Sequence, residues 1–225
     1  MNQIEKKKKV AESAFLTVLP SLNKETVLGI GTGSTTNYFI EELNRAKVSI
    51  KGVVCSSEAS KENLETSGIK VMQLNEVHGI DIYVDGADEF NSIFELIKGG
   101  GGALTREKIL VNSSDRFICI VDDTKFSELL GKFPLPIEVL EVARSAISRE
   151  IMRMGGKPVY RQNFVTDNGH QIIDVHNLKI DIPYEMEATL NNIPGVIENG
   201  LFAKRTADVI IQATDLKIIT LKKDT

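Results

Sequence analysis

Hydrophobic positions follow two alternating periodicities in the first half of the chain. At positions 3–19 they recur at helical spacing, and Pro20 ends the run, so we expect a helix there. Short apolar runs and further helical stretches then alternate. The expected strands are 26–30, 50–55, 80–84 and 117–121, and the expected helices are 35–43, 57–66 and 103–111. This alternation predicts an α/β fold with a Rossmann-like, doubly wound and mostly parallel sheet covered by helices on both faces.

The pattern changes after Gly131, where the proline-punctuated connector 132–136 shows neither periodicity. The elements predicted beyond it are strand 137–140, helix 143–154, strands 159–164 and 171–175, helix 184–191 and strand 196–199. This βαββαβ order is that of a ferredoxin-like α+β unit, with a turn at 167–169. Strands 207–213 and 216–221 are expected to complete the first sheet. We therefore predict a catalytic α/β domain, 1–131 plus 205–225, and a smaller α+β domain, 132–204.

Composition and charge narrow the classes of function. The 225 residues are 42% hydrophobic and 26% charged, which is typical of a globular protein. The net charge of −4 disfavours nucleic acid and membrane surfaces as partners, and we interpret the basic run 6–9 as a solvated helix face without a function. We expect Cys55 and Cys119 to be buried and unpaired by a disulfide. No signal-peptide stretch or membrane-length apolar segment is evident, so we expect a cytoplasmic protein.

A glycine-rich turn, Gly29-Ile30-Gly31-Thr32-Gly33-Ser34-Thr35-Thr36, follows the first expected strand and opens the next helix. Backbone N–H groups and hydroxyls at a helix start favour an anion. The glycine spacing differs from the dinucleotide-binding pattern, and a tight turn that binds nothing is the alternative. Ser56 and Ser57 hold the equivalent place after the second strand, where they indicate either a ligand contact or helix capping alone.

Acidic residues gather after the third expected strand, in Asp85-Gly86-Ala87-Asp88-Glu89. Three carboxylates within five residues suit acid/base chemistry or a divalent metal. Aspartates are also common in turns that have only a structural role. The three histidines have no partner at a spacing typical of a zinc site.

Four consecutive glycines, at positions 99–102, are the most informative feature of the sequence. Such a run costs conformational entropy that an ordinary loop avoids, which indicates a close approach to the backbone. Lys98, just before the run, is suited to stabilise an oxyanion, and Glu107, early in the following helix, is suited to act as a base. The alternative is a flexible linker before a solvated helix.

Together these segments resemble the type A family of ribose-5-phosphate isomerases over essentially the whole chain. The motifs are GIGTGSTT (29–36), SSEAS (56–60), YVDGADE (83–89), IKGGGGALTREKI (97–109), DDTKFSELLGKFPLPIEV (122–139) and GLFAKRTADV (200–209). The resemblance implies interconversion of D-ribose 5-phosphate and D-ribulose 5-phosphate in the non-oxidative pentose phosphate pathway, without a metal or an organic cofactor. It also implies a homo-oligomer, either a homodimer or a tetramer. The sequence departs from the family at Glu58, where many members have Asp, and at Gly102, where members often have Ala.

The resemblance also implies roles for individual residues. Glu107 takes the position of the catalytic base, and Lys98 faces the developing charge. Asp85 assists ring opening, while Asp88 orients hydroxyls or shares that role. The implied substrate-binding residues are Thr32, Gly33, Ser34, Thr35, Asp85, Gly86, Ala87, Asp88, Lys98, Gly99, Gly100, Gly101 and Lys125.

Two other functions stay open on the residues alone. One is a non-enzymatic sugar-phosphate sensor, although the lone N-terminal helix and the acidic charge disfavour a DNA-reading module. The other is a different enzyme on a related sheet, such as an amino-sugar-phosphate deaminase or an acyl-CoA transferase, because a fold does not fix the chemistry. The place of the phosphate is open as well, since the glycine-rich turn, the serine segment and Lys125 all offer contacts with an anion.

Overall fold

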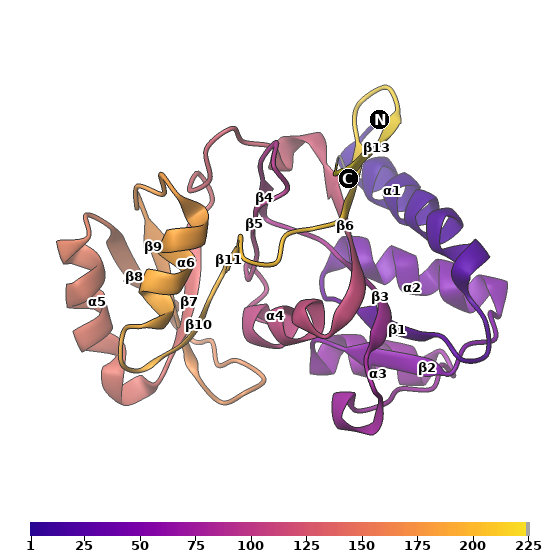
Figure 1. Cartoon of the computed structure of the whole chain (residues 1–225), viewed down its shortest axis with the longest axis horizontal. Helices are drawn as coiled ribbons and strands as arrows, with labels where there is room; N and C mark the ends of the chain where they lie inside the picture. The colour runs from indigo at the N-terminus through magenta and orange to yellow at the C-terminus, as the bar shows by residue number, and fades with distance from the viewer. Residues whose placement is uncertain (224–225) are drawn as a thin grey trace. The chain divides into compact units, whose positions relative to one another are not determined.

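The computed structural model describes residues 1–223, which divide into two compact units. Unit 1 comprises residues 1–86, 109–125 and the C-terminal segment from residue 207, and unit 2 comprises residues 87–108 and 126–206. Figure 1 shows that each unit has a β-sheet of its own, accompanied by its own helices.

Unit 1 is built on a six-stranded sheet with the strand order β13-β12-β6-β3-β1-β2. The strands are β1 Val27–Ile30, β2 Gly52–Cys55, β3 Ile80–Asp85, β6 Ser114–Asp122, β12 Val209–Ala213 and β13 Ile218–Lys222. The other elements are α1 Gln3–Val18, α2 Ser34–Ala46, α3 Glu58–Thr66, η1 Leu19–Ser21, η2 Leu74–Glu76 and η3 Asp123–Lys125. β13 runs antiparallel to β12, whereas the other neighbouring strands are parallel. The prediction of an α/β fold with a mostly parallel sheet is confirmed.

The strand order of unit 1 reverses beside β1. The chain leaves β1 toward β2 on one side and then returns to β3 on the other side. In doubly wound sheets, ligands bind outside the carboxyl ends of the strands at such a switch point. The glycine-rich turn after β1 and Asp85 at the end of β3 both lie there, and the N–H of Gly31 donates to the carbonyl of Val84 at 2.9 Å.

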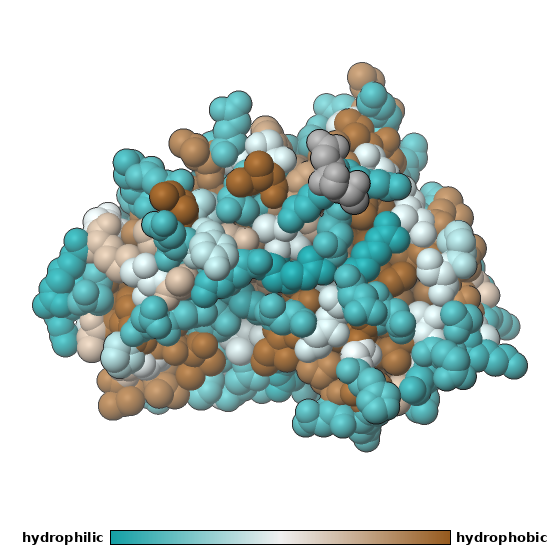
Figure 2. All heavy atoms as spheres, in the orientation of Figure 1, coloured by the Kyte–Doolittle hydropathy of each residue, from teal (hydrophilic) through white to brown (hydrophobic). Residues whose placement is uncertain are grey.

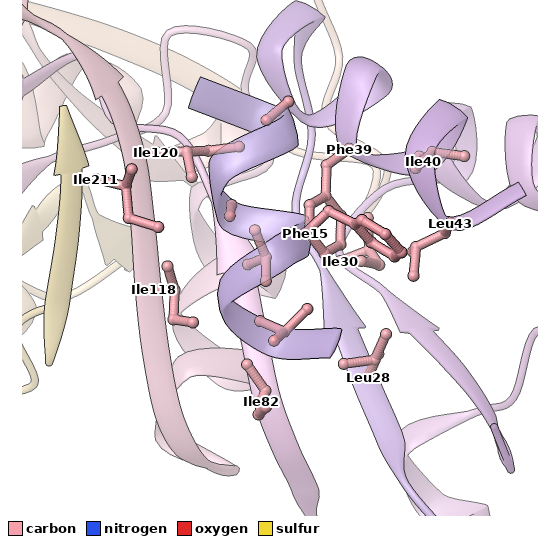
Figure 3. Packing of buried hydrophobic residues seen from close by; sticks show 14 of the residues in the cluster. Phe15, Leu28, Ile30, Phe39, Ile40, Leu43, Ile82, Ile118, Ile120 and Ile211 are labelled. Atoms are coloured by element: carbon pink, nitrogen blue, oxygen red, sulfur yellow. The ribbon is translucent and has the colours of Figure 1, made fainter. Parts of the chain in front are cut away.

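One face of this sheet packs against α1 and α2 in a cluster of buried apolar side chains. Phe15 of α1 and Phe39 of α2 meet edge to face, with ring centroids 6.5 Å apart. Figure 3 shows these rings over strand side chains that share one face of the sheet, namely Leu28, Ile30, Ile82, Ile118, Ile120 and Ile211. Alternate residues of a strand point to the same face, so the apolar runs of the sequence supply this surface directly.

Local signals determine where α1 begins and ends. Asn2 and Glu5 form a capping box, in which each side chain accepts the backbone N–H of the other residue. At the other end, Pro20 lies within the short 3-10 turn η1. A proline cannot supply the N–H that the helix interior requires, so α1 stops where the sequence predicts.

The larger sheet of unit 2 is antiparallel and four-stranded, with the order β10-β7-β9-β8. Its elements are β7 Leu135–Val139, η4 Glu141–Ala143, α5 Arg144–Arg153, β8 Lys157–Tyr160, β9 Gln171–His176, α6 Pro183–Asn191 and β10 Val196–Asn199. This order of strands and helices confirms the predicted ferredoxin-like arrangement. A second apolar cluster, which includes Ile137, Ile147 and Ile173, fills the space between this sheet and its helices.

Unit 2 also contains a three-stranded sheet that the apolar pattern does not reveal. Its strands are β4 Glu89–Phe90, β5 Leu96–Ile97 and β11 Leu201–Phe202, each only two residues long. The helix α4, Leu104–Asn112, starts in unit 2 and ends in unit 1.

The two compact units divide the chain at other points than the predicted domains do. Residues 87–108 and 126–131 were expected in the α/β domain, but they group with unit 2. Pairing of β5 with β11 holds the first of these segments there. The second segment is held in unit 2 because the Phe90 and Phe126 rings pack edge to face with centroids 5.4 Å apart, and the Ser127 N–H donates to the Phe90 carbonyl.

The predicted strand 159–164 ends earlier than expected, at Tyr160. Residues 161–170 form a loop between β8 and β9, in which the N–H of Gly169 donates to the carbonyl of Thr166. We call this segment the 161–170 loop. Within this loop the positive φ angles are those of Asn163, at +55°, and Gly169, at +82°.

Neither Cys55 nor Cys119 is in a disulfide, and only Cys119 is as buried as expected. Cys119 is buried in β6 and Cys55 is half-buried at the end of β2. Burial raises the pKa of the Cys55 thiol to about 12, so this side chain stays neutral and unreactive at ordinary pH. None of the described helices is long and apolar enough to cross a membrane.

Two neighbouring residues of α1 test how much the apolar cluster stabilises unit 1. Phe15 is 6% exposed, whereas Leu16 is 59% exposed. Figure 2 shows hydrophobic and hydrophilic residues mixed over the face that it presents. Phe15→Ala leaves a cavity against Phe39 and is expected to lower the free energy of unfolding by about 3–5 kcal/mol. Leu16→Ala is the control and is expected to change it by no more than about 0.5 kcal/mol. Urea unfolding followed by circular dichroism measures both, and equal effects of the two variants would contradict the packing described here.

Candidate active site

Asp85 of unit 1 has a fully buried carboxylate, and four donors converge on it. Its Oδ2 accepts the Tyr83 hydroxyl at 2.6 Å, while its Oδ1 accepts the N–H of Gly86 at 2.7 Å and that of Thr32 at 3.1 Å. The hydroxyl of Thr36 approaches Oδ1 at 3.5 Å. The side chain of Asp85 is therefore held in one orientation at the switch point of the sheet.

Gly31 is the residue that allows this arrangement. A Cβ atom at position 31 would lie 1.8 Å from Cγ of Asp85, which no side chain tolerates. The glycine-rich turn thus allows a close approach that the sequence analysis did not predict for it, and the approaching group is the Asp85 carboxylate of the same chain.

The serine segment after β2 is bonded to the same turn. Ser57 is the N-cap of α3, and its Oγ accepts the N–H of Ser60 at 3.1 Å. The Ser57 hydroxyl also lies 3.0 Å from Oγ1 of Thr32, and the Ser60 hydroxyl donates to the Gly31 carbonyl at 2.7 Å. Ser57 therefore caps α3, as one of the two sequence interpretations predicts, and it is also bonded to the glycine-rich turn.

The N-terminus of α2 is open to an anion. Its N-cap residue, Gly33, has no side chain to cap the first turn. Lys7 of α1 donates from Nζ to Oγ of Ser34, the first residue of α2, at 2.8 Å. A lysine charge, a hydroxyl and free helical N–H groups thus meet within unit 1.

The interpretation of residues 6–9 as a solvated helix face is wrong for Lys6 and incomplete for Lys7. Lys6 is only 5% exposed, and its Nζ lies 2.6 Å from Oδ1 of Asp123 and 2.8 Å from Oδ1 of Asp215. Hydrogen bonds with Asp123 first and Asp215 second raise the pKa of Lys6 to about 12. The repeat of four lysines conceals these differences, because only the neighbours of each residue in the fold distinguish one lysine from the next.

Lys125 lies at the end of η3, which α1 holds in place. Lys6 binds Asp123, and Nε2 of Gln3 donates to Oδ2 of Asp122 at 2.7 Å. The N–H of Thr124 donates to the other oxygen of Asp122 at 3.0 Å. The half-buried Lys125 therefore follows residues 122–124, each of which forms a hydrogen bond described above.

The three clustered acids have separate partners. Asp85 binds the groups of unit 1 described above, whereas Asp88 belongs to unit 2 and accepts the N–H of Gly100 at 2.7 Å. Glu89 accepts the N–H groups of Gly131, Lys132 and Phe133 at 2.8 to 3.3 Å, so it organises the connector before β7. Glu89 is thus structural, while Asp85 and Asp88 stay candidates for chemistry.

Lys98 and Glu107 form the central pair of unit 2. Nζ of Lys98 lies 3.3 Å from Oε2 of Glu107, and each side chain is at most 4% exposed. We call residues 98–102 the glycine loop. It joins β5 to the start of α4, and Glu107 lies in the first turn of that helix. The two side chains are therefore close enough to take part in the same reaction, as the sequence analysis predicts.

Sequence reasoning missed the surroundings of this pair. The Phe202 ring of β11 lies under both Lys98 and Lys108, with Nζ atoms 5.6 and 5.0 Å from its centroid. Lys108 in turn binds Glu187 at 3.0 Å and Glu198 at 2.8 Å. The only sequence signal was the quoted motif at 200–209, since β11 is too short to show a period. Among the described residues, no group of three or more His, Cys, Asp or Glu side chains is arranged to hold a metal ion.

Comparison with known proteins shows the family of this chain. Residues 52–216 match the family model described as ribose 5-phosphate isomerase A (phosphoriboisomerase A). A ribose 5-phosphate isomerase A from Neisseria gonorrhoeae is 45% identical, with a TM-score of 0.94 over 100% of this chain and 99% of that one. The enzyme from Methanocaldococcus jannaschii is 37% identical, with a TM-score of 0.91 over 99% of this chain and 100% of that one. A third structure, a D-ribose-5-phosphate isomerase in complex with phospho-erythronic acid, is 40% identical, with a TM-score of 0.92 over the same shares. This chain belongs to the ribose 5-phosphate isomerase A family.

Proposed function

We propose that this chain interconverts D-ribose 5-phosphate and D-ribulose 5-phosphate, with Glu107 as the base. Family membership supports the reaction, which is an aldose–ketose isomerisation of the pentose phosphate pathway. The observation that carries the assignment of residues is the buried Lys98–Glu107 pair at 3.3 Å, in which Lys98 begins the glycine loop and Glu107 follows it in α4. The geometry of unit 2 thus supplies a carboxylate and a cation side by side.

The reaction moves one proton between two neighbouring carbons. Glu107 removes the proton of C2, the electrons of that C–H bond form the C1–C2 double bond, and the C1 carbonyl oxygen becomes negative. The resulting enediolate takes the proton back at C1, while the hydroxyl proton shifts from O2 to O1. One carboxylate that reaches both carbons is sufficient, and Lys98 stabilises the negative oxygen. No atom is gained or lost, and no electron acceptor is needed.

Residues of unit 1 complete the proposal. Asp85 exchanges protons with the ring and anomeric oxygens during ring opening, and its four donors keep its carboxylate in place for that task. Asp88 orients substrate hydroxyls. Of the three candidate anion contacts, the start of α2 has the best support for the phosphate, because Lys7 adds a cation to Thr32, Gly33, Ser34 and Thr35. Lys125 contributes a further cation.

The phospho-erythronic acid of the related structure suits the same chemistry. A sugar-acid phosphate has a planar carboxylate with two oxygens on one carbon, as the enediolate has two oxygens on neighbouring carbons. A site that stabilises the enediolate would bind such a compound more tightly than the substrate. We further propose a homo-oligomer, either a homodimer or a tetramer, in the cytoplasm.

The direct test of this function is an assay with the purified full chain. We expect ribose 5-phosphate to be converted to ribulose 5-phosphate, detected by the ketose product, in buffer that contains EDTA. Glucosamine 6-phosphate and an acyl-CoA are the control substrates for the two other enzymes considered. We expect no release of ammonia from the first and no acyl transfer from the second. Folded protein that leaves ribose 5-phosphate unchanged would refute the proposed function.

Glu107→Gln tests the base. The amide keeps the size of the side chain but cannot accept the C2 proton, so kcat is expected to fall about 10²–10⁴-fold with KM little changed. Glu198→Gln is the matched control, because it neutralises the carboxylate partner of another buried lysine, Lys108. Steady-state kinetics of both variants provide the comparison, and a kcat for Glu107→Gln near that of the unchanged chain would exclude the assignment.

Lys7→Met tests the place of the phosphate. Loss of a charge-assisted contact that is the same in the ground state and the transition state is expected to raise KM for ribose 5-phosphate about tenfold, with kcat nearly unchanged. Lys8→Met is the control, since Nζ of Lys8 lies over the Tyr38 ring at 5.5 Å and not at the start of α2. Equal KM values for the two variants would place the phosphate elsewhere.

A further inference from the structure

The 161–170 loop of unit 2 contacts the glycine loop through Arg161. Nη1 of Arg161 donates to the carbonyls of Gly99 and Gly100 at 3.3 and 3.2 Å. Its Nε donates to Oδ2 of Asp174 at 2.8 Å, and its Nη2 binds the other oxygen of that carboxylate. The planar guanidinium is therefore fixed on one side by β9 and presents its other side to the backbone of the glycine loop.

Arg161 and Asp88 bind opposite ends of the same peptide unit. The carbonyl of Gly99 and the N–H of Gly100 belong to one planar group, in which they point in opposite directions. Arg161 binds the carbonyl and Asp88 accepts the N–H at 2.7 Å. Rotation of this peptide plane would break both contacts, so two side chains together determine its orientation.

Phe164 of the same loop explains the glycine at position 102. Gly102 has a φ of +86°, and a Cβ atom there would lie 2.1 Å from Cζ and 2.6 Å from Cε1 of Phe164. The Phe164 ring is in turn held by Arg161, whose guanidinium lies 5.2 Å from the ring centroid. Position 102 is one of the two departures from the family pattern noted above, and in this chain the phenyl ring occupies the space of a side chain.

The 161–170 loop also contacts the first turn of α4. Arg106 donates from Nε to Oδ1 of Asn168 and from Nη2 to the carbonyl of Asp167, both at 2.8 Å. Glu138 accepts the hydroxyls of Thr105 and Thr166, so it links the start of α4 to the same loop. Contacts thus extend from the glycine loop to the residue before Glu107.

We propose that Arg161 and Phe164 are positioning residues. They hold the glycine loop so that the side chains of Lys98 and Glu107 keep the relative position that the reaction requires. This inference rests on the proposed function, since it assigns a task to residues that do not touch the reacting atoms. The Gly102 and Phe164 positions form one packing pair, so a side chain at 102 is tolerated only when the residue at 164 is smaller.

A double-mutant cycle tests the packing pair. Gly102→Ala in the unchanged chain is expected to lower kcat about 10²-fold, because the Cβ displaces either the phenyl ring or the loop. In the Phe164→Val background, the fall in kcat caused by Gly102→Ala is expected to be at least about tenfold smaller. The strain of a positive φ is present in both backgrounds and cancels in the comparison. An equal loss in both backgrounds would overturn the pair, because φ alone would then explain the glycine.

Arg161→Lys tests the second positioning residue without removing its charge. A lysine can keep the ion pair with Asp174 but cannot reach both carbonyls with one planar fork. We expect faster amide hydrogen exchange at residues 99–105 and a fall in kcat of about 10²-fold, with KM nearly unchanged. Arg144→Lys is the matched control, since Arg144 stacks on Tyr160 at 4.1 Å and binds Gln171 in the same sheet.

Hydrogen exchange separates this inference from the proposed function, because it requires no turnover. Faster exchange at 99–105 in Arg161→Lys but not in Arg144→Lys supports the positioning role even in a chain that fails to isomerise ribose 5-phosphate. Unchanged exchange at these residues, or a kcat unchanged in an active enzyme, overturns it. Thermal unfolding of all variants shows whether a loss of activity accompanies general destabilisation. An equal loss of kcat in Arg144→Lys would show a nonspecific effect of the sheet and would also overturn the proposal.

Discussion

A buried ammonium–carboxylate pair is stable only when the surrounding structure fixes both groups, and unit 2 is organised around that requirement. Lys98 and Glu107 are both almost fully buried and 3.3 Å apart. Removal of two charges from water costs several kcal/mol for each ion, which their attraction offsets only in good geometry. Neither a glycine run nor the first turn of a helix is rigid by itself. The geometry must therefore come from residues outside the pair.

Three sets of contacts supply it. The Phe202 ring faces the ammonium of Lys98, and pairing of β11 with β5 fixes the strand that leads to this lysine. Lys108 anchors α4 through Glu187 and Glu198, one residue after Glu107. The 161–170 loop contacts the backbone between the two partners. Each set comes from a part of the chain distant in sequence, so the pair depends on the whole of unit 2 being folded.

Much of this could be predicted from the sequence, and the limits have physical causes. Apolar periodicity located the main strands and helices because burial of one face determines them, and a run of glycines marked the loop with the candidate lysine and glutamate. The three-stranded sheet was missed because two-residue strands have no period. Lys6 and Lys7 were dismissed as one solvated run, although one lies buried between two aspartates and the other reaches Ser34. Identical neighbours in sequence become different in the fold, and no local pattern records that difference.

The contacts around the glycines also determine how mobile their backbone is. A glycine-rich loop suggests mobility, because glycine gives the unfolded chain the most freedom. Here the residues around the loop use the space that missing side chains leave. The Asp85 carboxylate lies where a Cβ of Gly31 would be, and the Phe164 ring lies where a Cβ of Gly102 would be. Once such groups are in place, the backbone beside them has fewer accessible conformations than the backbone of an ordinary loop. A sequence that is locally flexible thus becomes rigid through its neighbours, and that rigidity is what a reaction needs when it moves one proton between two adjacent carbons.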